Sequence, residues 1–459
     1  MILTNLVQKG LHYYSENNPE GALEQFQSAF TLEPLNAETL NNIGVIYFKM
    51  GKIADALAYL EKAINVNPEY ETAKKNYTSV RMSMDNAISK QANPKNSGNK
   101  NTTLSEYYNK PLKILFISQT FYPTKRAHGG AEFSALTMMK AFAEDGHHSS
   151  VICMDEDGQE FDYMGVKIIH IPSIDTLEAE FIKINPDIIM THIHWSPSAI
   201  WLAKKYCKTS ILFIRSYENI CPDPIQMLSC KRDCEICSSF IPMRQEMLNH
   251  RFAVINADIV ICDSEFTKSI ITTFYKKKAD LIYELVDIDA YRVEKNYADF
   301  ITMNQPEKHK GNEIFHEIAK LMPEERFMTV GRGIHDASSP NLIHFGQTSP
   351  RIFYSHTKIM LVPSIWPEPF GRVAIEAMAN GIPVIASCVG GLPEVVQNAG
   401  ILIDDYMNPQ KWVYEIKSLL QNPNLYKDMQ KKGAEQVKKF EIKTEINKLR
   451  NILEILVSN

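Results

Sequence analysis

The chain has 459 residues, which is enough for about three domains of ordinary size. Hydrophobic residues make up 44% of it and charged residues 22%, a composition that excludes a disordered or fibrous chain. The net charge of −5 offers no general attraction to nucleic acid, and no apolar run is long enough to predict a transmembrane segment. The first residues lack the pattern of a signal peptide. We therefore expect a cytoplasmic protein and leave peripheral attachment to a membrane open.

Residues 1–85 contain an internal repeat of 34 residues. Seven positions carry it: the first copy has Leu6, Gly10, Tyr13, Ala22, Phe26, Ala29 and Pro34, and the second has Leu40, Gly44, Tyr47, Ala56, Leu60, Ala63 and Pro68. The pattern resembles the tetratricopeptide repeat, in which two antiparallel helices pack through small residues. We expect two repeats and a capping helix here, followed by a flexible linker over 86–111. The repeats either dock a partner protein or merely solubilise or dimerise the chain.

Two series of apolar strands follow, and each alternates with helical segments. The first series is KILFI, SSVICM, VKIIHI, DIIMTH, SILFIR and DIVICD, and the second is DFITMNQ, RFMTVG, NLIHFG, KIMLVPS, IPVIAS and GILID. This alternation predicts an α/β fold with Rossmann-like domains at 112–297 and 298–440. Residues 441–459 have one apolar helix face, which we expect to pack back on the first domain. Parallel sheets bind ligands at the carboxyl ends of their strands, so we expect one cleft shared by both domains.

The stretch VPSIWPEPFGRVAIEAMANGIPVIASCVGGLPEVV, from Val362 to Val396, carries the most chemical information. Gly371 opens a predicted helix whose first amides are unpaired and suit an anion or a hydroxyl group. Glu376 follows about one and a half turns later and could accept hydrogen bonds from a diol such as ribose. Gly390 and Gly391 precede another helix and offer further amides to a phosphate. The stretch therefore predicts a nucleotide site.

The same stretch resembles the signature of the family 4 retaining glycosyltransferases of GT-B fold, with its two glutamates Glu368 and Glu376. The resemblance implies that Glu376 binds the ribose and that Glu368 holds the donor sugar together with the amides of Phe370 and Gly371. It also implies that Gly129 and Gly130, before the helical run FSALTMMKAFAEDG, cover the donor phosphates. The alternative is that both glutamates are solvated acids at the surface.

Lys310 is the candidate cation for the departing diphosphate, because it lies between a strand and a helix in a Lys-Gly pair that resembles the family's phosphate-contacting lysine. Many members carry arginine six residues earlier, where this chain has Asn304, and Lys308 or Arg332 could compensate. The alternative is that Lys310 is an ordinary surface lysine.

Two histidines, His192 and His194, follow the strand DIIM and could reach the cleft, and we take His194 as a catalytic candidate. The alternative is that they are ordinary surface residues. Relatives often place His-Asp near the reacting sugar, where this chain has Arg215 and Ser216. This departure concerns the acceptor side of the reaction.

Four cysteines crowd into one loop of the first α/β domain: Cys221, Cys230, Cys234 and Cys237. Four thiolates can form a tetrahedral structural zinc site, and zinc would stabilise a loop with little apolar content. The alternative is four reduced thiols without a metal, because the spacing is less regular than in paired Cys-x2-Cys motifs.

The main hypothesis is a glycosyltransferase that transfers a hexose-type sugar from a UDP- or GDP-sugar to a glycan, lipid or protein acceptor. The resemblance implies retention of configuration and no catalytic metal or cofactor. Asn304 and Arg215 favour an alternative, a non-catalytic subunit of GT-B fold whose repeats recruit partners to a glycosylation complex. A GT-B phosphorylase or epimerase is a third hypothesis, but such an enzyme would not need the repeats.

Overall fold

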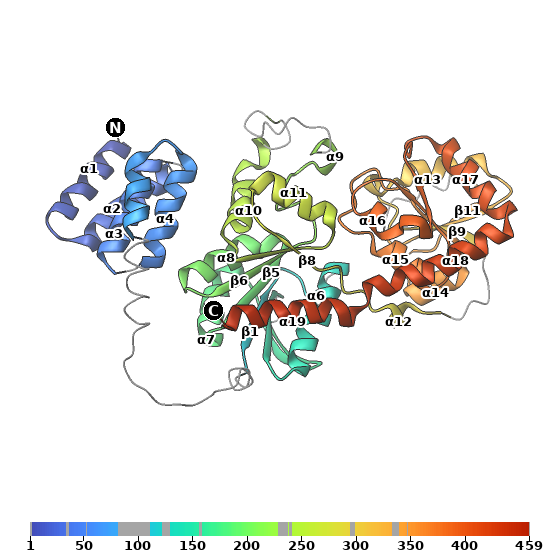
Figure 1. Cartoon of the computed structure of the whole chain (residues 1–459), viewed down its shortest axis with the longest axis horizontal. Coiled ribbons are helices and arrows are strands. Elements are labelled where there is room, and N and C mark those ends of the chain that lie inside the picture. Colours follow the sequence, from blue (N-terminus) through green and yellow to red (C-terminus); the bar gives the residue numbers. More distant parts are fainter. Residues whose placement is uncertain are drawn as a thin grey trace. The chain divides into compact units, whose positions relative to one another are not determined.

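The computed structural model describes residues 2–33, 36–51, 53–80, 111–121, 129–155, 158–227, 237, 241–293, 299–332, 339–346 and 348–458. The chain forms two compact units, one made by the N-terminal helices and one that contains both sheets (Figure 1). Residues 81–110, where we predicted the end of the capping helix and the linker, lie outside the described residues.

The N-terminal unit is built from helix pairs. Its helices are α1 (Ile2–Ser15), α2 (Pro19–Leu32), α3 (Ala37–Lys49) and α4 (Ile53–Val66), and residues 71–80 are also helical. A Cβ atom on Gly10 would lie 2.7 Å from the ring of Phe26, and one on Gly44 would lie 2.6 Å from Leu60. The paired helices therefore approach each other so closely that only glycine fits at these positions. This confirms the role of the small residues in the predicted repeat.

The first sheet has eight strands in the order β3-β4-β2-β1-β5-β6-β7-β8. They are β1 (Lys113–Ile117), β2 (His148–Met154), β3 (Glu160–Tyr163), β4 (Val166–Ile171), β5 (Ile188–His192), β6 (Thr209–Ile214), β7 (Ile259–Cys262) and β8 (Asp280–Leu281). All neighbours are parallel except β3 and β4. The sequence analysis missed β3 and β8, because β3 is a partly exposed edge strand and β8 has only two residues.

The helices of this domain are α6 (Gly130–Glu144), α7 (Leu177–Ile184), α8 (Ser196–Lys205), α9 (Pro224–Met227), α10 (Arg244–Asn256) and α11 (Glu265–Tyr275). Helix α6 buries Leu136, Met139 and Phe142 against the apolar strands β1 and β2. Its first turn lies just beyond the carboxyl end of β1, which is where parallel α/β sheets bind ligands.

The second sheet is parallel, with six strands in the order β11-β10-β9-β12-β13-β14. The strands are β9 (Phe300–Asn304), β10 (Arg326–Val330), β11 (Leu342–His344), β12 (Thr357–Val362), β13 (Val384–Ser387) and β14 (Ile401–Ile403). The helices are α12 (Ile288–Tyr291), α13 (Asn312–Leu321), α14 (Pro350–His356), α15 (Arg372–Ala379), α16 (Leu392–Val396), α17 (Pro409–Gln421) and α18 (Pro423–Val437). Two parallel α/β sheets in one unit confirm the predicted fold class.

The chain crosses between these two domains twice. Val286 already belongs to the core of the second domain, about ten residues before the boundary that we predicted at 297. Helix α19 (Ile442–Ser458) returns and lies along the first domain (Figure 1), where it buries Ile446, Leu449 and Leu453 in the core under β1 and β2.

Candidate active site

The residues singled out in the second domain lie in loops that follow parallel strands. Lys310 follows β9, the segment from Glu368 to Gly371 joins β12 to α15, and Gly390 and Gly391 join β13 to α16. Because β9, β12 and β13 are neighbours in the sheet, these three loops meet at one edge. This is the position expected for a ligand site of an α/β domain.

Lys310 and Glu368 form a close ion pair. The Lys310 Nζ lies 2.6 and 2.8 Å from the two carboxylate oxygens, and the Ser364 hydroxyl donates to Oε1 at 2.5 Å. Burial by itself would raise the pKa of Glu368, but the charge of Lys310 and these hydrogen bonds outweigh it and hold the pKa below its usual value. The Nζ also lies 4.8 Å from the centre of the Trp366 ring. Neither residue is an ordinary surface side chain, so that alternative is wrong.

Glycines allow these loops to pack backbone against backbone. Gly311 has a φ of +86°, and a Cβ there would collide with the carbonyl of Pro363. Gly390 has a φ of +64°, and a Cβ there would lie 2.5 Å from the Glu368 nitrogen. The Gly391 amide donates to the Glu368 carbonyl at 2.7 Å, so our prediction that this amide serves a phosphate must be corrected. The two glycines of this pair hold the Glu368 loop in place.

Glu376 is buried within α15 and has two partners. The Tyr354 hydroxyl donates to its Oε2 at 2.7 Å, and the Nε of Arg372 lies 3.5 Å from its Oε1. Burial raises the pKa of Glu376, although both partners act in the opposite direction. Gly371, with a φ of +110°, caps this helix, and a Cβ there would lie 2.7 Å from Leu392. The carboxylate is thus held in one orientation and is not a solvated acid.

The Gly129–Gly130 loop opens α6 in the first domain, and its contacts explain both glycines. Glu132 accepts a hydrogen bond from the Gly129 amide at 2.9 Å, and a Cβ on Gly129 would lie 2.8 Å from that carboxylate. A Cβ on Gly130 would lie 2.6 Å from Cδ of Arg372, which comes from the second domain. A side chain at position 130 would therefore displace the Arg372 side chain from this contact between the domains. The role of Gly130 over a phosphate stays a prediction.

Two hydroxyl groups of the first domain bind the Glu368 loop directly. Tyr217 donates to the carbonyl of Pro367 and Ser264 to that of Pro369, both at 2.5 Å. The sequence analysis missed these residues, as it missed Tyr354 and Ser364. Tyr217 and Ser264 follow β6 and β7, and their position at the carboxyl ends of buried strands was the available signal.

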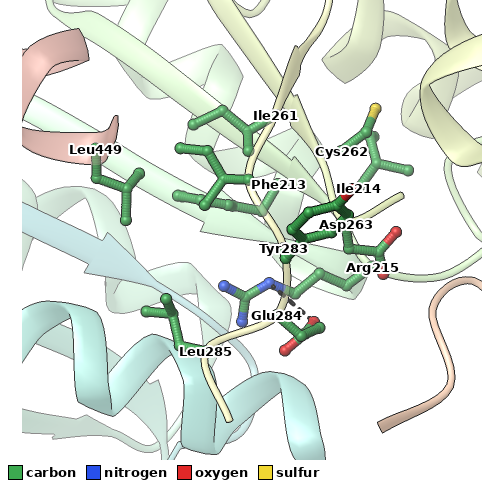
Figure 2. A pocket seen from close by; sticks show the side chains of 11 residues that line it. Phe213, Ile214, Arg215, Ile261, Cys262, Asp263, Tyr283, Glu284, Leu285 and Leu449 are labelled. Carbon is green, nitrogen blue, oxygen red and sulfur yellow. Dashed lines mark ion pairs between the residues drawn. The ribbon is translucent and has the colours of Figure 1, made fainter. Parts of the chain in front are cut away.

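A small pocket lies between these strand ends and the segment 282–285 (Figure 2). Arg215 and Glu284 face each other in it, with Nε and Oε1 3.5 Å apart and both side chains 6% exposed. Asp263 is also buried here, and burial together with the nearby charge of Glu284 raises its pKa to about 8. Thr267 donates a hydrogen bond to it at 2.9 Å. The pocket therefore combines buried groups of both charges at the edge of the first sheet.

The two candidate histidines have different environments. His192 is 1% exposed, and its Nε2 lies 2.8 Å from the Ser118 hydroxyl. Burial and the charge of Arg215 hold the pKa of His192 well below its usual value, and the ring is too buried to be an ordinary surface residue. His194 is half exposed, and its Nδ1 lies 3.1 Å from Glu218. Burial and Glu246 raise the pKa of Glu218 to about 7.

Lys308 and Arg332, proposed to compensate for the arginine that is absent at position 304, lie at the surface. Asn304 ends β9 opposite Val330, and the Lys308 side chain is 81% exposed and lies 3.7 Å from Glu313. Arg332 is exposed, and its amide donates to Gln305.

The cysteine loop is described only in part. The Cys221 thiol donates to the Asp223 carbonyl at 3.3 Å, whereas Cys230 and Cys234 lie outside the described residues. Among the residues that the structure covers, no group of three or more His, Cys, Asp or Glu side chains could hold a metal ion. The zinc site has no support here and stays a prediction.

Among the residues that the structure describes, no helix is both long and apolar enough to span a membrane.

Comparison with known protein families defines the class. Residues 128–290 match the model of Glycosyltransferase Family 4, and residues 337–436 match that of Glycosyl transferases group 1. Residues 10–51 and 37–70 match models of the tetratricopeptide repeat. The chain therefore carries the two domains of a family 4 glycosyltransferase of GT-B fold behind a tetratricopeptide repeat module, as the sequence analysis predicted.

Curated relatives match parts of the chain to different extents. An uncharacterized 42.6 kDa protein in the cps region of Klebsiella pneumoniae is 26% identical over 332 residues, which are 62% of this chain and 87% of that protein. An uncharacterized glycosyltransferase of Methanocaldococcus jannaschii is 29% identical over 45% of this chain and 62% of its own. The D-inositol 3-phosphate glycosyltransferase of Segniliparus rotundus is 43% identical, but over only 19% of either chain. The last two matches span less than two thirds of the relatives' own lengths.

Solved structures share the fold at low sequence identity. The sucrose-phosphate synthase of Thermosynechococcus elongatus has a TM-score of 0.63 and 18% identity, over 75% of this chain and 99% of its own. The Anabaena protein Alr3699/HepE, solved in complex with UDP and glucose, has a TM-score of 0.58 and 16% identity, over 74% of this chain and 99% of its own. These likenesses concern the architecture alone.

Proposed function

We propose that this glycosyltransferase transfers a sugar from a nucleoside diphosphate to a hydroxyl group of an acceptor, with retention of configuration and without a catalytic metal. The observation that carries the proposal is the Lys310–Glu368 pair at the carboxyl edge of the second sheet, eight residues before the buried Glu376. The complexes of Alr3699/HepE with UDP and with UDP-glucose support a nucleotide donor. Retention rests on the resemblance to the retaining enzymes of family 4.

Each residue has a separate role in this proposal. Lys310 supplies positive charge to the departing diphosphate, which a cation and backbone amides can stabilise without a metal ion. Glu368 is kept ionised by Lys310 and Ser364, so it accepts hydrogen bonds from hydroxyl groups of the donor sugar. Glu376 accepts hydrogen bonds from the ribose diol, because a carboxylate with two partners still has free acceptor sites.

The test uses purified protein and several nucleotide sugars. Hydrolysis of UDP-, GDP- and ADP-sugars is measured, and the nucleoside diphosphate that binds is identified by thermal shift. We expect Glu376→Ala to weaken binding of that diphosphate by about 10- to 150-fold, because a hydrogen bond to a charged group contributes about 1.5–3 kcal/mol. Glu368→Gln should lower turnover more than affinity.

Glu435→Gln is the matched control, because Glu435 lies on the exposed face of α18 and pairs with the exposed Lys438. It should behave as the wild type. A wild-type protein that binds and hydrolyses none of these compounds would support the alternative, a non-catalytic subunit.

A further inference from the structure

A nucleoside diphosphate brings several negative charges into the cleft, and Lys310 alone does not balance them. Its ammonium group is already paired with Glu368 at 2.6 Å. Asn304 stands where the family resemblance leads one to expect an arginine, and Lys308 is directed to solvent. Further positive charge is therefore needed if a diphosphate binds here.

Two buried arginines, one from each domain, meet at the start of α6. Arg372 begins α15, and its Nη1 donates to the Gly130 carbonyl at 2.7 Å. Arg215 follows β6 and donates through its own Nη1 to the carbonyl of Ala131. Their side chains are 14% and 6% exposed. Desolvating two guanidinium groups is costly, so their burial at one place indicates that an anion belongs there.

Glu284 is the carboxylate that the two arginines share, and it satisfies them poorly, while Arg372 also lies 3.5 Å from the Glu376 carboxylate. The Glu284 Oε1 lies 3.5 Å from Arg215 Nε and its Oε2 lies 3.8 Å from Arg372 Nη1. Within the described part of the chain, the buried Oε2 has no hydrogen-bond partner. Arg372 has no hydrogen bond to Glu284 to lose, and in turning toward another anion it would exchange its hydrogen bonds to the Gly130 carbonyl and the Tyr291 hydroxyl.

The position of Arg372 identifies that anion. It lies four residues before Glu376 on the same face of α15, and the two side chains are 3.5 Å apart. On its other side it contacts Gly130. In a nucleotide sugar the diphosphate joins the ribose to the sugar. Arg372 lies between Glu376, which we propose binds the ribose, and the Gly129–Gly130 loop, so its guanidinium group is expected beside the diphosphate.

We propose that Arg372, supported by Arg215, binds the diphosphate of the donor, and that Glu284 orients both guanidinium groups toward it. The inference rests on the proposed function. A guanidinium group donates two parallel hydrogen bonds to phosphate oxygens, which a lysine cannot do. Arg372 and Arg215, which lie at the interface between the domains, thereby provide the positive charge that an arginine in place of Asn304 would have supplied.

The experiment compares a nucleoside with its diphosphate. Binding of UDP, GDP and ADP, and of uridine, guanosine and adenosine, is measured by calorimetry for the full-length wild type and for Arg372→Ala. We expect Arg372→Ala to lose about 10- to 150-fold in affinity for the diphosphate that the wild type binds, with the nucleoside changed less than about three-fold. Arg372→Lys should fall between the two proteins, because it keeps the charge and loses the paired hydrogen bonds.

Arg450→Ala is the matched control. Arg450 donates two 2.7 Å hydrogen bonds to Asp145 at the opposite end of α6, so its loss removes an arginine contact to the same helix away from the cleft. It should keep both affinities. If Arg372→Ala does not fold, Arg372→Lys provides the test, through its loss of affinity for the diphosphate compared with its loss for the nucleoside.

Two results would overturn the inference. If the Arg372 variants lose affinity equally for the nucleoside and for its diphosphate, Arg372 only holds the domains together. If they keep the wild-type affinity for both compounds, Arg372 contacts neither of them. A wild-type protein that binds no diphosphate would instead refute the proposed function.

Discussion

Glu368 and Asp263 are both buried carboxyl groups, yet their pKa values move in opposite directions. Burial favours the neutral form of each. Glu368 has Lys310 in direct contact and stays below its usual pKa, whereas Asp263 has the like charge of Glu284 nearby and rises to about 8. Arg215 and Thr267 oppose this rise only in part. Between two carboxyl groups that are both buried, the neighbouring charges therefore decide which one stays ionised at neutral pH.

The raised pKa of Asp263 predicts a pH-dependent stability. In the unfolded chain an aspartate has a pKa of about 3.9, so between that value and about 8 the folded protein holds a proton that the unfolded chain releases. The free energy of unfolding should then fall as pH rises, by up to about 1.4 kcal/mol per unit from this one group. Asp263→Asn stays neutral, so its thermal midpoint should rise relative to the wild type from pH 5 to 8. Asp299→Asn changes an exposed aspartate, so its thermal midpoint should follow that of the wild type over this pH range. A difference in thermal midpoint between Asp263→Asn and the wild type that does not change with pH would contradict the pKa shift.

At the scale of elements, the site depends on loops that contact each other through backbone atoms. The Glu368 loop lies against the Gly390–Gly391 turn on one side and receives hydrogen bonds from Tyr217 and Ser264 on the other. These contacts come from three different strand ends. A side chain added to the turn must displace the loop that carries Glu368.

Gly390→Ala should therefore destabilise the protein and impair donor binding together. A left-handed φ at a non-glycine residue costs about 1–2 kcal/mol, and the collision with Glu368 adds to that cost. Gly146→Ala is the control, because Gly146 has a φ of +87° with no atom within 4 Å of its Cβ position. We expect Gly390→Ala to lose more thermal stability than Gly146→Ala. Of these two variants, only Gly390→Ala should lose nucleotide affinity. Equal losses of stability and unchanged affinity in both variants would show that the turn does not support the Glu368 loop.

At the scale of the whole molecule, the donor site and the repeats belong to separate units. Every residue proposed to contact the donor lies beyond residue 128, and the helix pairs contribute none of them. A repeat module that binds the acceptor, or a protein that carries it, would raise the acceptor's local concentration at the cleft. The repeats would then affect transfer without affecting the donor.

Deleting residues 1–110 tests this division. Donor hydrolysis should stay within about two-fold of the full-length protein, because the donor site is intact, whereas transfer to the native acceptor should fall by about ten-fold or more. The measurement is the ratio of the two rates for each protein. The repeat unit supplied as a separate chain is the control, and it should not restore transfer, since covalent linkage is what raises the local concentration. Full transfer by the truncated protein would leave the repeats as a module for solubility or association.

Local sequence patterns and one family resemblance were enough to predict the fold and the class of this protein. The 34-residue repeat and the strand runs predicted the repeat module and the α/β fold, and the resemblance of the stretch from Val362 to Val396 to the family 4 signature implied the glycosyltransferase class. The repeat and the strands could be predicted because apolar periodicity, glycine and proline act over a few residues. The short strands β3 and β8 escaped this reading, since two to four partly exposed residues carry no such periodicity.

Only the tertiary structure decided which residues meet at the site. Lys310 and Glu368 are 58 residues apart, Tyr217 and Pro367 are 150 apart, and Arg372 and Gly130 are 242 apart. The spacing of residues in the chain does not encode such contacts, because they depend on the order of strands in two sheets and on the return of α19 to the first domain. For the same reason the sequence assigned the Gly391 amide to a phosphate, whereas in the folded chain this amide donates to the Glu368 carbonyl.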